Sequence, residues 1–229
     1  MMSFGPINYL VESFMIPFLE FSYSSIFPNY GVAIIILTII LKMLFFPLMD
    51  KQYKSMKKMQ DIAPKMTDIR KKLKDNPKKM QQEVMKLYKE NNVNPLSGCL
   101  PMVLQIPFFI AIYSTILSDS FTALLNAPGV NKGLFSFWLS DLSLADTTFI
   151  LPIVLAVFTF YSQKIMMVDP KQKQLLYLSP IMILFFGLKL PSGVLLYWAT
   201  STILSTVQQM KTIKTNKTEI INIMPKKAH

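Results

Sequence analysis

The sequence predicts an all-α polytopic membrane protein, and three observations support this fold class. Hydrophobic residues make up 52% of the 229 residues and charged residues only 16%, whereas soluble domains carry about 25% charge. Five segments are apolar over roughly the 20 residues that a spanning helix needs. Basic residues gather in alternate connections between these segments, as the positive-inside rule expects of a multi-pass protein.

The first 29 residues are expected to lie on the outer membrane surface. Within segment 6–27, Pro17 interrupts the apolar pattern, and a spanning helix would bury Glu12 and Glu20. We therefore predict that 1–29 holds an interfacial amphipathic helix, with a sixth span as the alternative. The N-terminus has neither the basic stretch of a secretory signal nor an acylatable cysteine, so neither cleavage nor lipidation is expected.

The five predicted spans begin with residues 30–50. The other four lie within 99–210, near 99–118, 148–167, 175–190 and 193–210. The turn Leu190-Pro191-Ser192-Gly193 joins the last two spans so tightly that they must form an antiparallel hairpin.

The charge distribution predicts the orientation of the chain. The segment 51–98 carries thirteen Lys and Arg against five acids, whereas the loop 119–147 has Lys132 alone against three acids. Five further lysines lie in the tail 211–229. Because basic connections stay in the cytoplasm, we predict that the N-terminus and 119–147 lie outside and the C-terminus lies inside.

The cytoplasmic segment 51–98 is predicted to be a helical hairpin. Apolar residues recur at spacings of three and four from Tyr53 to Leu73, and a second stripe runs from Met80 to Leu87. Two interpretations are open. The stripes pack only on each other, or the methionine-rich stripe contacts apolar partners.

Local signals mark the ends of the two hairpin helices. Asn76 is the expected N-cap of the second helix, with Pro77 at its first position. Pro64 is expected to kink or divide the first helix. The basic tail 211–229 has little apolar periodicity, and its composition predicts an unstructured arm.

One lysine, Lys42, lies inside the first span. It precedes Asp50 by eight residues, or about 12 Å of helix, which is farther than its side chain comfortably reaches. A lysine at a span centre costs roughly 2.5 to 3.5 kcal/mol. Either it snorkels to the inner surface, or it faces a water-containing cavity lined by polar groups. Thr38, four residues earlier, shares its helical face, and Gln105 of the second span is a candidate interhelical hydrogen bonder.

The sequence shows no pattern for covalent catalysis or metal binding. Its one cysteine, Cys99, and its one histidine, His229, offer neither a disulfide framework nor a metal site. We expect no enzyme, cofactor or small-molecule substrate. A solute or ion transporter is the alternative function, although the chain has no internal repeat and no intramembrane acid for ion coupling.

Four stretches carry a family resemblance. KQYKSMKKMQDIAPKM (51–66), LYKENNVNPLSGCLPMVLQIPFFIAIYS (87–114), ILPIVLAVFTFYSQKIM (150–166) and LPSGVLLYWATSTILSTVQQ (190–209) resemble the YidC-type membrane protein insertases, relatives of the mitochondrial oxidase-assembly and chloroplast Albino proteins. The resemblance implies five transmembrane helices around a hydrophilic groove that opens to the cytoplasm and the lipid. It also implies a bacterial plasma (inner) membrane protein that inserts nascent membrane proteins without ATP.

The resemblance also implies a set of substrate-binding groove residues. Lys42 takes the place of the family's groove arginine, so the charge is kept but the planar fork is lost. Tyr197 matches an aromatic residue that meets the passing segment, although an interfacial aromatic belt is the alternative for it and for Trp198. The predicted groove residues are Lys42, Thr38, Gln105, Gln163, Tyr197, Trp198 and Ser201.

The expected partners follow from this resemblance and from the charge. Nascent membrane proteins are the expected substrates, and a Sec-type translocon is a further candidate partner. The basic tail and hairpin are candidate contacts for the ribosome and for anionic lipids.

Overall fold

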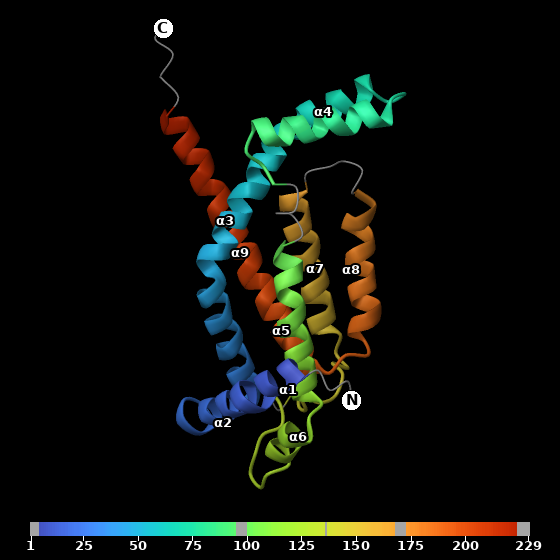
Figure 1. Ribbon diagram of the computed structural model, residues 1–229. Coiled ribbons are helices and arrows are strands. Elements are labelled where there is room, and N and C mark those ends of the chain that lie inside the picture. The colour runs from blue at the N-terminus through green and yellow to red at the C-terminus, as the bar shows by residue number, and fades with distance from the viewer. Residues whose placement is uncertain (1–4, 95–99, 136, 168–172, 224–229) are drawn as a thin grey trace.

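The structure, a computed structural model, describes residues 5–94, 100–135, 137–167 and 173–223 (Figure 1). Its described residues form helices and one isolated bridge, between Ala145 and Pro191, so the predicted all-α class is confirmed. The helices are α1 (Gly5–Leu10), the π-helix η1 (Val11–Met15), α2 (Ile16–Ser25), α3 (Tyr30–Lys72), α4 (Pro77–Glu90), α5 (Leu100–Ile116), α6 (Asp119–Leu125), α7 (Ile150–Met166), α8 (Lys173–Gly187) and α9 (Ser192–Ile223).

The N-terminal helices lie across one end of the bundle (Figure 1). Val11, Met15 and Leu19 follow one another at a spacing of four and are buried, while both glutamates of this segment are exposed. The apolar face packs against α3 and α5. This segment is therefore helical, with one buried apolar side, and it runs across the bundle. That it lies in the membrane interface stays a prediction.

Helix α3 is longer than predicted, because the first span and the first hairpin helix form one continuous helix. Asn29 caps its start by accepting a 3.0 Å hydrogen bond from the Val32 amide. Pro47 and Pro64 both lie inside the helix. A division at Pro64 is therefore wrong, and tertiary packing on both sides of Pro64 maintains the helix. Residue 50, the predicted inner end of the first span, lies within this helix, so the end of the span stays a prediction.

The two helices of the hairpin, the end of α3 and α4, pack against each other. Asn76 caps α4 as predicted, accepting a 3.1 Å bond from the Lys79 amide. The two apolar stripes form one cluster, so the interpretation in which they pack on each other is the one that the structure shows. The buried members of this cluster are Met59, Ile62, Met66, Leu87 and Val93.

The remaining long helices complete the bundle. Helix α9 packs against α3, α5 and α7, and α8 packs against α7 (Figure 1). The loop 119–147 contains the short helix α6, which was not predicted from the sequence, and Ser118 caps it. Helix α9 continues to Ile223, so the predicted unstructured tail is helical that far, and residues 224–229 lie outside the described part.

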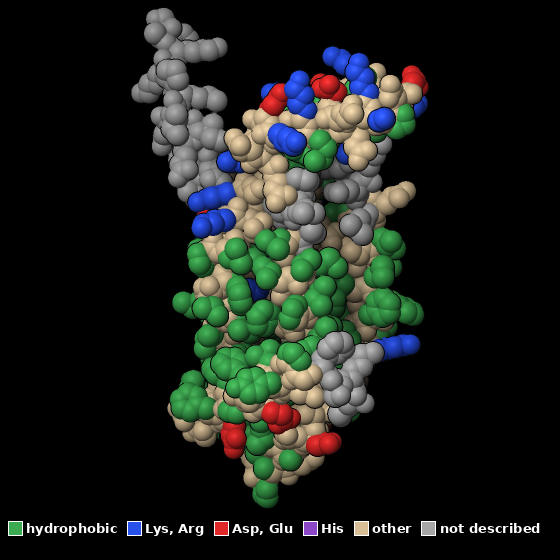
Figure 2. Space-filling view, in the orientation of Figure 1, with side chains coloured by type: hydrophobic (Ala, Val, Ile, Leu, Met, Phe, Trp, Pro, Cys, Tyr) green, Lys and Arg blue, Asp and Glu red, His purple; other side chains and the backbone are tan. Residues whose placement is uncertain are grey.

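Helix length separates α3 from its neighbours. Among the described helices, α3 alone is long and apolar enough to cross a bilayer unaided, and α5 with α6, bent by 56°, passes the same test as a pair. Helix α7 and the stretch Leu176–Gly187 are apolar but shorter. Figure 2 shows hydrophobic side chains over the middle of the bundle and most Lys and Arg at the hairpin end.

Candidate functional site

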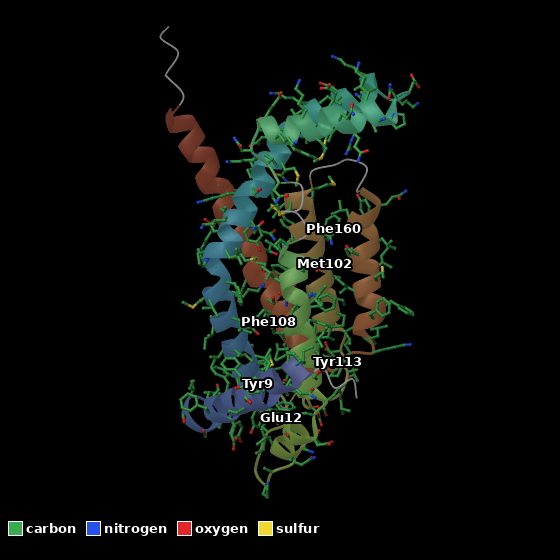
Figure 3. All side chains as sticks on the ribbon, viewed as in Figure 1. Tyr9, Glu12, Met102, Phe108, Tyr113 and Phe160 are labelled. Atoms are coloured by element: carbon green, nitrogen blue, oxygen red, sulfur yellow. The ribbon has the colours of Figure 1, made fainter. Side chains whose placement is uncertain are left out.

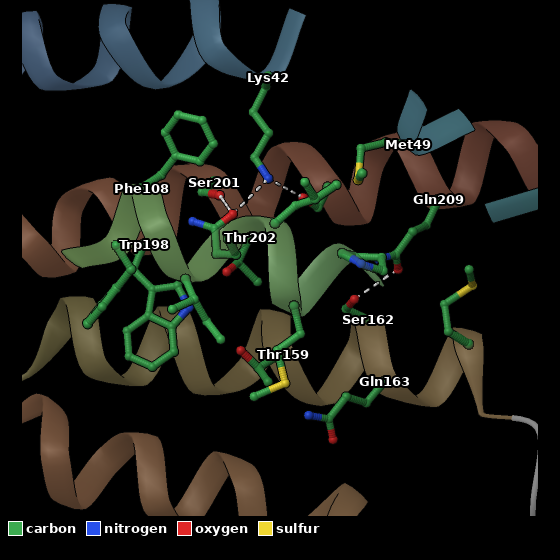
Figure 4. Close-up of a pocket in the computed structure, with 18 of the residues that line it drawn as sticks. Lys42, Met49, Phe108, Thr159, Ser162, Gln163, Trp198, Ser201, Thr202 and Gln209 are labelled. Atoms are coloured by element: carbon green, nitrogen blue, oxygen red, sulfur yellow. Dashed lines mark hydrogen bonds between the residues drawn. The ribbon is translucent and has the colours of Figure 1, made fainter. Parts of the chain in front are cut away.

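A cavity of about 700 Å³ lies among α3, α5, α7, α8 and α9 (Figure 4). Most of its wall is apolar, and Lys42 is the one charged side chain among the residues described as lining it. The polar lining comes from every one of these helices. Its members are Lys42, Tyr53, Gln105, Thr159, Ser162, Gln163, Ser179, Tyr197, Trp198, Ser201, Thr202, Ser205 and Gln209.

Lys42 points from α3 into this cavity (Figure 4). Its Nζ donates a 2.9 Å hydrogen bond to Ser205 Oγ and a longer one, of 3.4 Å, to Gln105 Oε1. These two partners belong to α9 and α5. The ammonium therefore stays between three helices, and the structure matches the cavity interpretation rather than the snorkelling one.

Gln105 is the centre of the network around Lys42. Its Nε2 donates a 2.7 Å bond to the Tyr197 hydroxyl, and its Oε1 accepts a 3.2 Å bond from Ser201 Oγ. Because the amide nitrogen is occupied by Tyr197, the amide oxygen faces Lys42. Gln105 thus connects Lys42 to two further predicted residues, Tyr197 and Ser201, as an interhelical role for Gln105 requires.

Thr38 does not reach the cavity, which corrects its predicted place. Its side chain is fully buried, and its hydroxyl donates a 2.7 Å bond to the Ile34 carbonyl of its own helix. Bonding of this kind, to the carbonyl four residues back, is common for threonine within helices. A shared helical face with Lys42 was therefore not sufficient, because the cavity ends before this turn.

Gln163 and Trp198 both line the cavity, on the side of α7 and α8. Gln163 Oε1 accepts a 2.8 Å bond from Ser179 Oγ, which connects the two helices. Trp198 packs edge-on against Phe109, with ring centroids 5.3 Å apart. Both predicted residues thus lie in the cavity wall.

Four polar residues that shape the inner part of the cavity were not among the predicted groove residues. Ser162 of α7 donates a 2.9 Å bond to Gln209 of α9. Tyr53 is 2% exposed, and burial raises its pKa above the ordinary value, against the opposing effect of hydrogen bonds with Ser205 and Gln209. The sequence did contain a pattern that could have identified two of them. Ser201, Ser205 and Gln209 recur every four residues, which places them on one face of α9.

The inner end of the cavity is covered by the base of the hairpin. Met49, Tyr53 and Met166 form a buried apolar cluster there. Gln60 Nε2 donates a 2.6 Å bond to the Ile165 carbonyl at the end of α7. The position of the hairpin base is thus coupled to both α7 and α9.

The cavity reaches the protein surface between α5 and α8. Met102 of α5 is 72% exposed and Phe186 of α8 is 52% exposed, yet both line the cavity. Figure 3 shows Met102 and Phe108 on the same helix, α5. Phe108 lies on the α3 side, where its ring packs edge-on against Phe45 at 5.3 Å. Exposed side chains of α5 and α8 thus border the cavity on this side.

Over the described residues we find no group of three or more potential metal ligands.

Comparisons with known proteins identify relatives of this chain. The family described as "60Kd inner membrane protein" matches residues 21–219. The membrane protein insertase YidC of Citrifermentans bemidjiense is 43% identical over 184 residues, which cover 80% of this chain and 33% of that protein. The insertase YidC of Syntrophus aciditrophicus is 44% identical over 193 residues, covering 83% and 34%.

A solved structure of a related protein has a similar fold. It is described as an active YidC insertase crystal structure with the first transmembrane domain resolved. The TM-score is 0.67 at 28% identity, with 90% of this chain and 46% of that chain covered. The chain spans about a third of the length of the curated relatives it matches.

Proposed function

Because the chain belongs to the 60Kd inner membrane protein family, whose relatives above are YidC insertases, we propose that it inserts membrane proteins through the groove beside Lys42. The single observation that supports this most strongly is the enclosed ammonium. An ionisable side chain inside a membrane span is costly, so it usually marks a functional site. Here it lies in a groove that also opens toward the lipid.

We propose five membrane spans: the first part of α3, and then α5, α7, α8 and the first part of α9. Helix α8 has 15 residues and so measures about 22 Å, less than the roughly 30 Å of a bilayer core. Short spans thin the surrounding bilayer. A thinner bilayer at the groove would shorten the path that a polar tail has to cross.

The proposed orientation places the hairpin end in the cytoplasm. Basic residues gather at that end in Figure 2, as the positive-inside rule expects of a cytoplasmic face. The N-terminal helices and the loop 119–147 would then lie outside. The basic hairpin and α9 end are the proposed contacts for ribosomes and anionic lipids.

The proposed mechanism is physical rather than covalent. Polar groups of the groove replace part of the hydration of a substrate's hydrophilic tail, and Lys42 supplies a counter-charge for acidic groups in it. The apolar segment then leaves between α5 and α8, where exposed Met102 and Phe186 flank the groove. Transfer of that segment into lipid, at roughly 25 cal/mol per Å² of apolar surface, provides the driving force.

Reconstitution tests this proposal. The purified chain is placed in liposomes with a single-span substrate whose short tail becomes protected from external protease when it crosses. We expect protection that depends on the chain and persists in Lys42→Arg, which keeps the charge. Solute flux without tail protection would instead support the transporter alternative and contradict the proposal.

A further inference from the structure

The loop between α6 and α7 carries a tight turn with an exposed aromatic tip. The Leu134 amide donates a 2.9 Å bond to the Leu139 carbonyl, and the Phe135 amide donates a 3.1 Å bond to the Trp138 carbonyl. The Phe135 ring stacks with those of Phe137 and Trp138, at centroid distances of 5.4 and 6.2 Å. Phe137 is 84% exposed and Phe135 is 44% exposed.

The base of this turn is packed closely, so the exposed rings do not belong to a loose loop. Leu134 and Leu139 are buried in the main core. A Cβ added to Gly133 would lie only 1.9 Å from the Leu139 carbonyl oxygen. The side chain of Asn29 donates a 2.9 Å bond to the Leu134 carbonyl. The base therefore fixes the direction in which the tip points.

The same contacts fix the depth of the turn along the bundle. Asn29 is the N-cap of α3, the helix that is apolar enough to cross a bilayer. A Cβ on Gly31, in the first turn of α3, would lie 2.8 Å from the Leu134 side chain. On the other side, the Gly193 amide at the start of α9 donates a 2.9 Å bond to the Leu142 carbonyl. The turn thus lies level with the ends of two proposed spans.

We propose that this aromatic turn, closed by Leu134 and Leu139, is a membrane-interface anchor whose Phe135 and Phe137 rings enter the lipid headgroup region, while Trp138 packs against the core beneath them. The segment 133–140 has no charged residue, and aromatic side chains are favoured at this level of a bilayer. A lipid surface fits better than water for a ring as exposed as that of Phe137.

The N-terminal helices support the choice of a lipid partner. They lie at the same end of the bundle as α6 (Figure 1), where Figure 3 labels Tyr9 and Glu12. Tyr9 is 74% exposed and Phe21 is 57% exposed. These rings and the aromatic turn would together form a belt around the outer end of the bundle. That belt would hold this end at a fixed depth while a substrate uses the groove.

Single-tryptophan fluorescence in vesicles tests the anchor. Phe137→Trp is made with Trp138→Phe and Trp198→Phe, and the protein is reconstituted in phosphatidylcholine brominated either near the glycerol end or near the methyl end of its chains. The loss of Trp138 removes no hydrogen bond, since its indole nitrogen has no partner in the described structure. We expect strong quenching by the shallow bromines, weaker quenching by the deep ones and little quenching by aqueous iodide.

Ala127→Trp in the same background is the matched control. This exposed residue follows α6 in the loop that extends farthest from the bundle in Figure 1. It should be quenched by iodide and not by brominated lipid. Phe135→Trp gives a second reading at the turn and should behave like Phe137→Trp. Iodide quenching at both turn positions equal to that at the control, without quenching by brominated lipid, would overturn the proposal.

Discussion

The substitution Gln105→Glu tests the electrostatic role of Lys42 with little change in shape. The amide oxygen at this position already lies 3.4 Å from Lys42 Nζ. A carboxylate there would form an ion pair with the ammonium. The Tyr197 hydroxyl, which now accepts from the amide nitrogen at 2.7 Å, can rotate and donate to the carboxylate. The fold should therefore remain while the groove loses its net charge.

The size of the effect follows from this distance. Two unit charges 3.4 Å apart interact by about 5 kcal/mol at an effective dielectric constant of about 20. An acidic substrate tail would have to compete with that internal pair for the ammonium. Since 1.4 kcal/mol corresponds to a factor of ten, even a third of this energy should reduce insertion of an acidic tail roughly tenfold.

Protease protection in liposomes is the assay, with two substrates that differ only in whether the tail is acidic or uncharged. We expect Gln105→Glu to lower protection of the acidic tail roughly tenfold and to change the uncharged tail much less. The control is Gln163→Glu, which is also in the groove but bonds Ser179 rather than Lys42. Equal insertion of both tails by Gln105→Glu, in a protein that stays folded, would refute the counter-charge reasoning.

Three further predictions concern the packing and the ends of the chain. Gly133→Ala should lower the free energy of unfolding by about 1–3 kcal/mol, because the new Cβ would meet a backbone oxygen. Gly5→Ala is the control and should leave that free energy unchanged, because nothing lies within 4 Å of its Cβ position. Equal denaturation midpoints for the two variants would contradict this prediction. Gln60→Ala should speed amide hydrogen exchange in the last turn of α7, whose carbonyl it caps, whereas the exposed Gln82→Ala should have no effect there. Removal of 215–229 should weaken salt-sensitive cosedimentation with ribosomes but leave insertion of a presynthesised substrate intact, and unchanged sedimentation would exclude that contact.

Local signals in the sequence were sufficient for most of the helices and for the cap of α4, but not for α6 and its Ser118 cap. Asn76 before Pro77 marks the start of α4 because the cap depends on neighbouring residues only. The continuity of α3 through Pro64 was not predictable in this way. It depends on contacts with α4, α7 and α9, which are distant in the sequence, and these contacts offset the hydrogen bond that a proline removes.

The groove shows the same division between local and long-range information. Lys42 could be identified because a charge in an apolar run is conspicuous. The partners that hold it, Ser205 and Gln105, lie 163 and 63 residues away in the sequence. Thr38 was assigned to the groove from its spacing to Lys42 and from the family resemblance. Spacing gives the direction of a side chain but not where a cavity ends along the helix.

Thiol labelling tests most directly whether the groove is a hydrated path that substrates occupy. Thr202→Cys places a thiol in the groove wall, and Met43→Cys places one on the 69% exposed outer face of α3, both in a chain with Cys99→Ser. We predict that a water-soluble thiol reagent modifies the groove variant rapidly and the α3 variant slowly, and that a substrate arrested during insertion protects the groove thiol. Equal, slow labelling of both variants, or groove labelling that an arrested substrate does not change, would contradict the account.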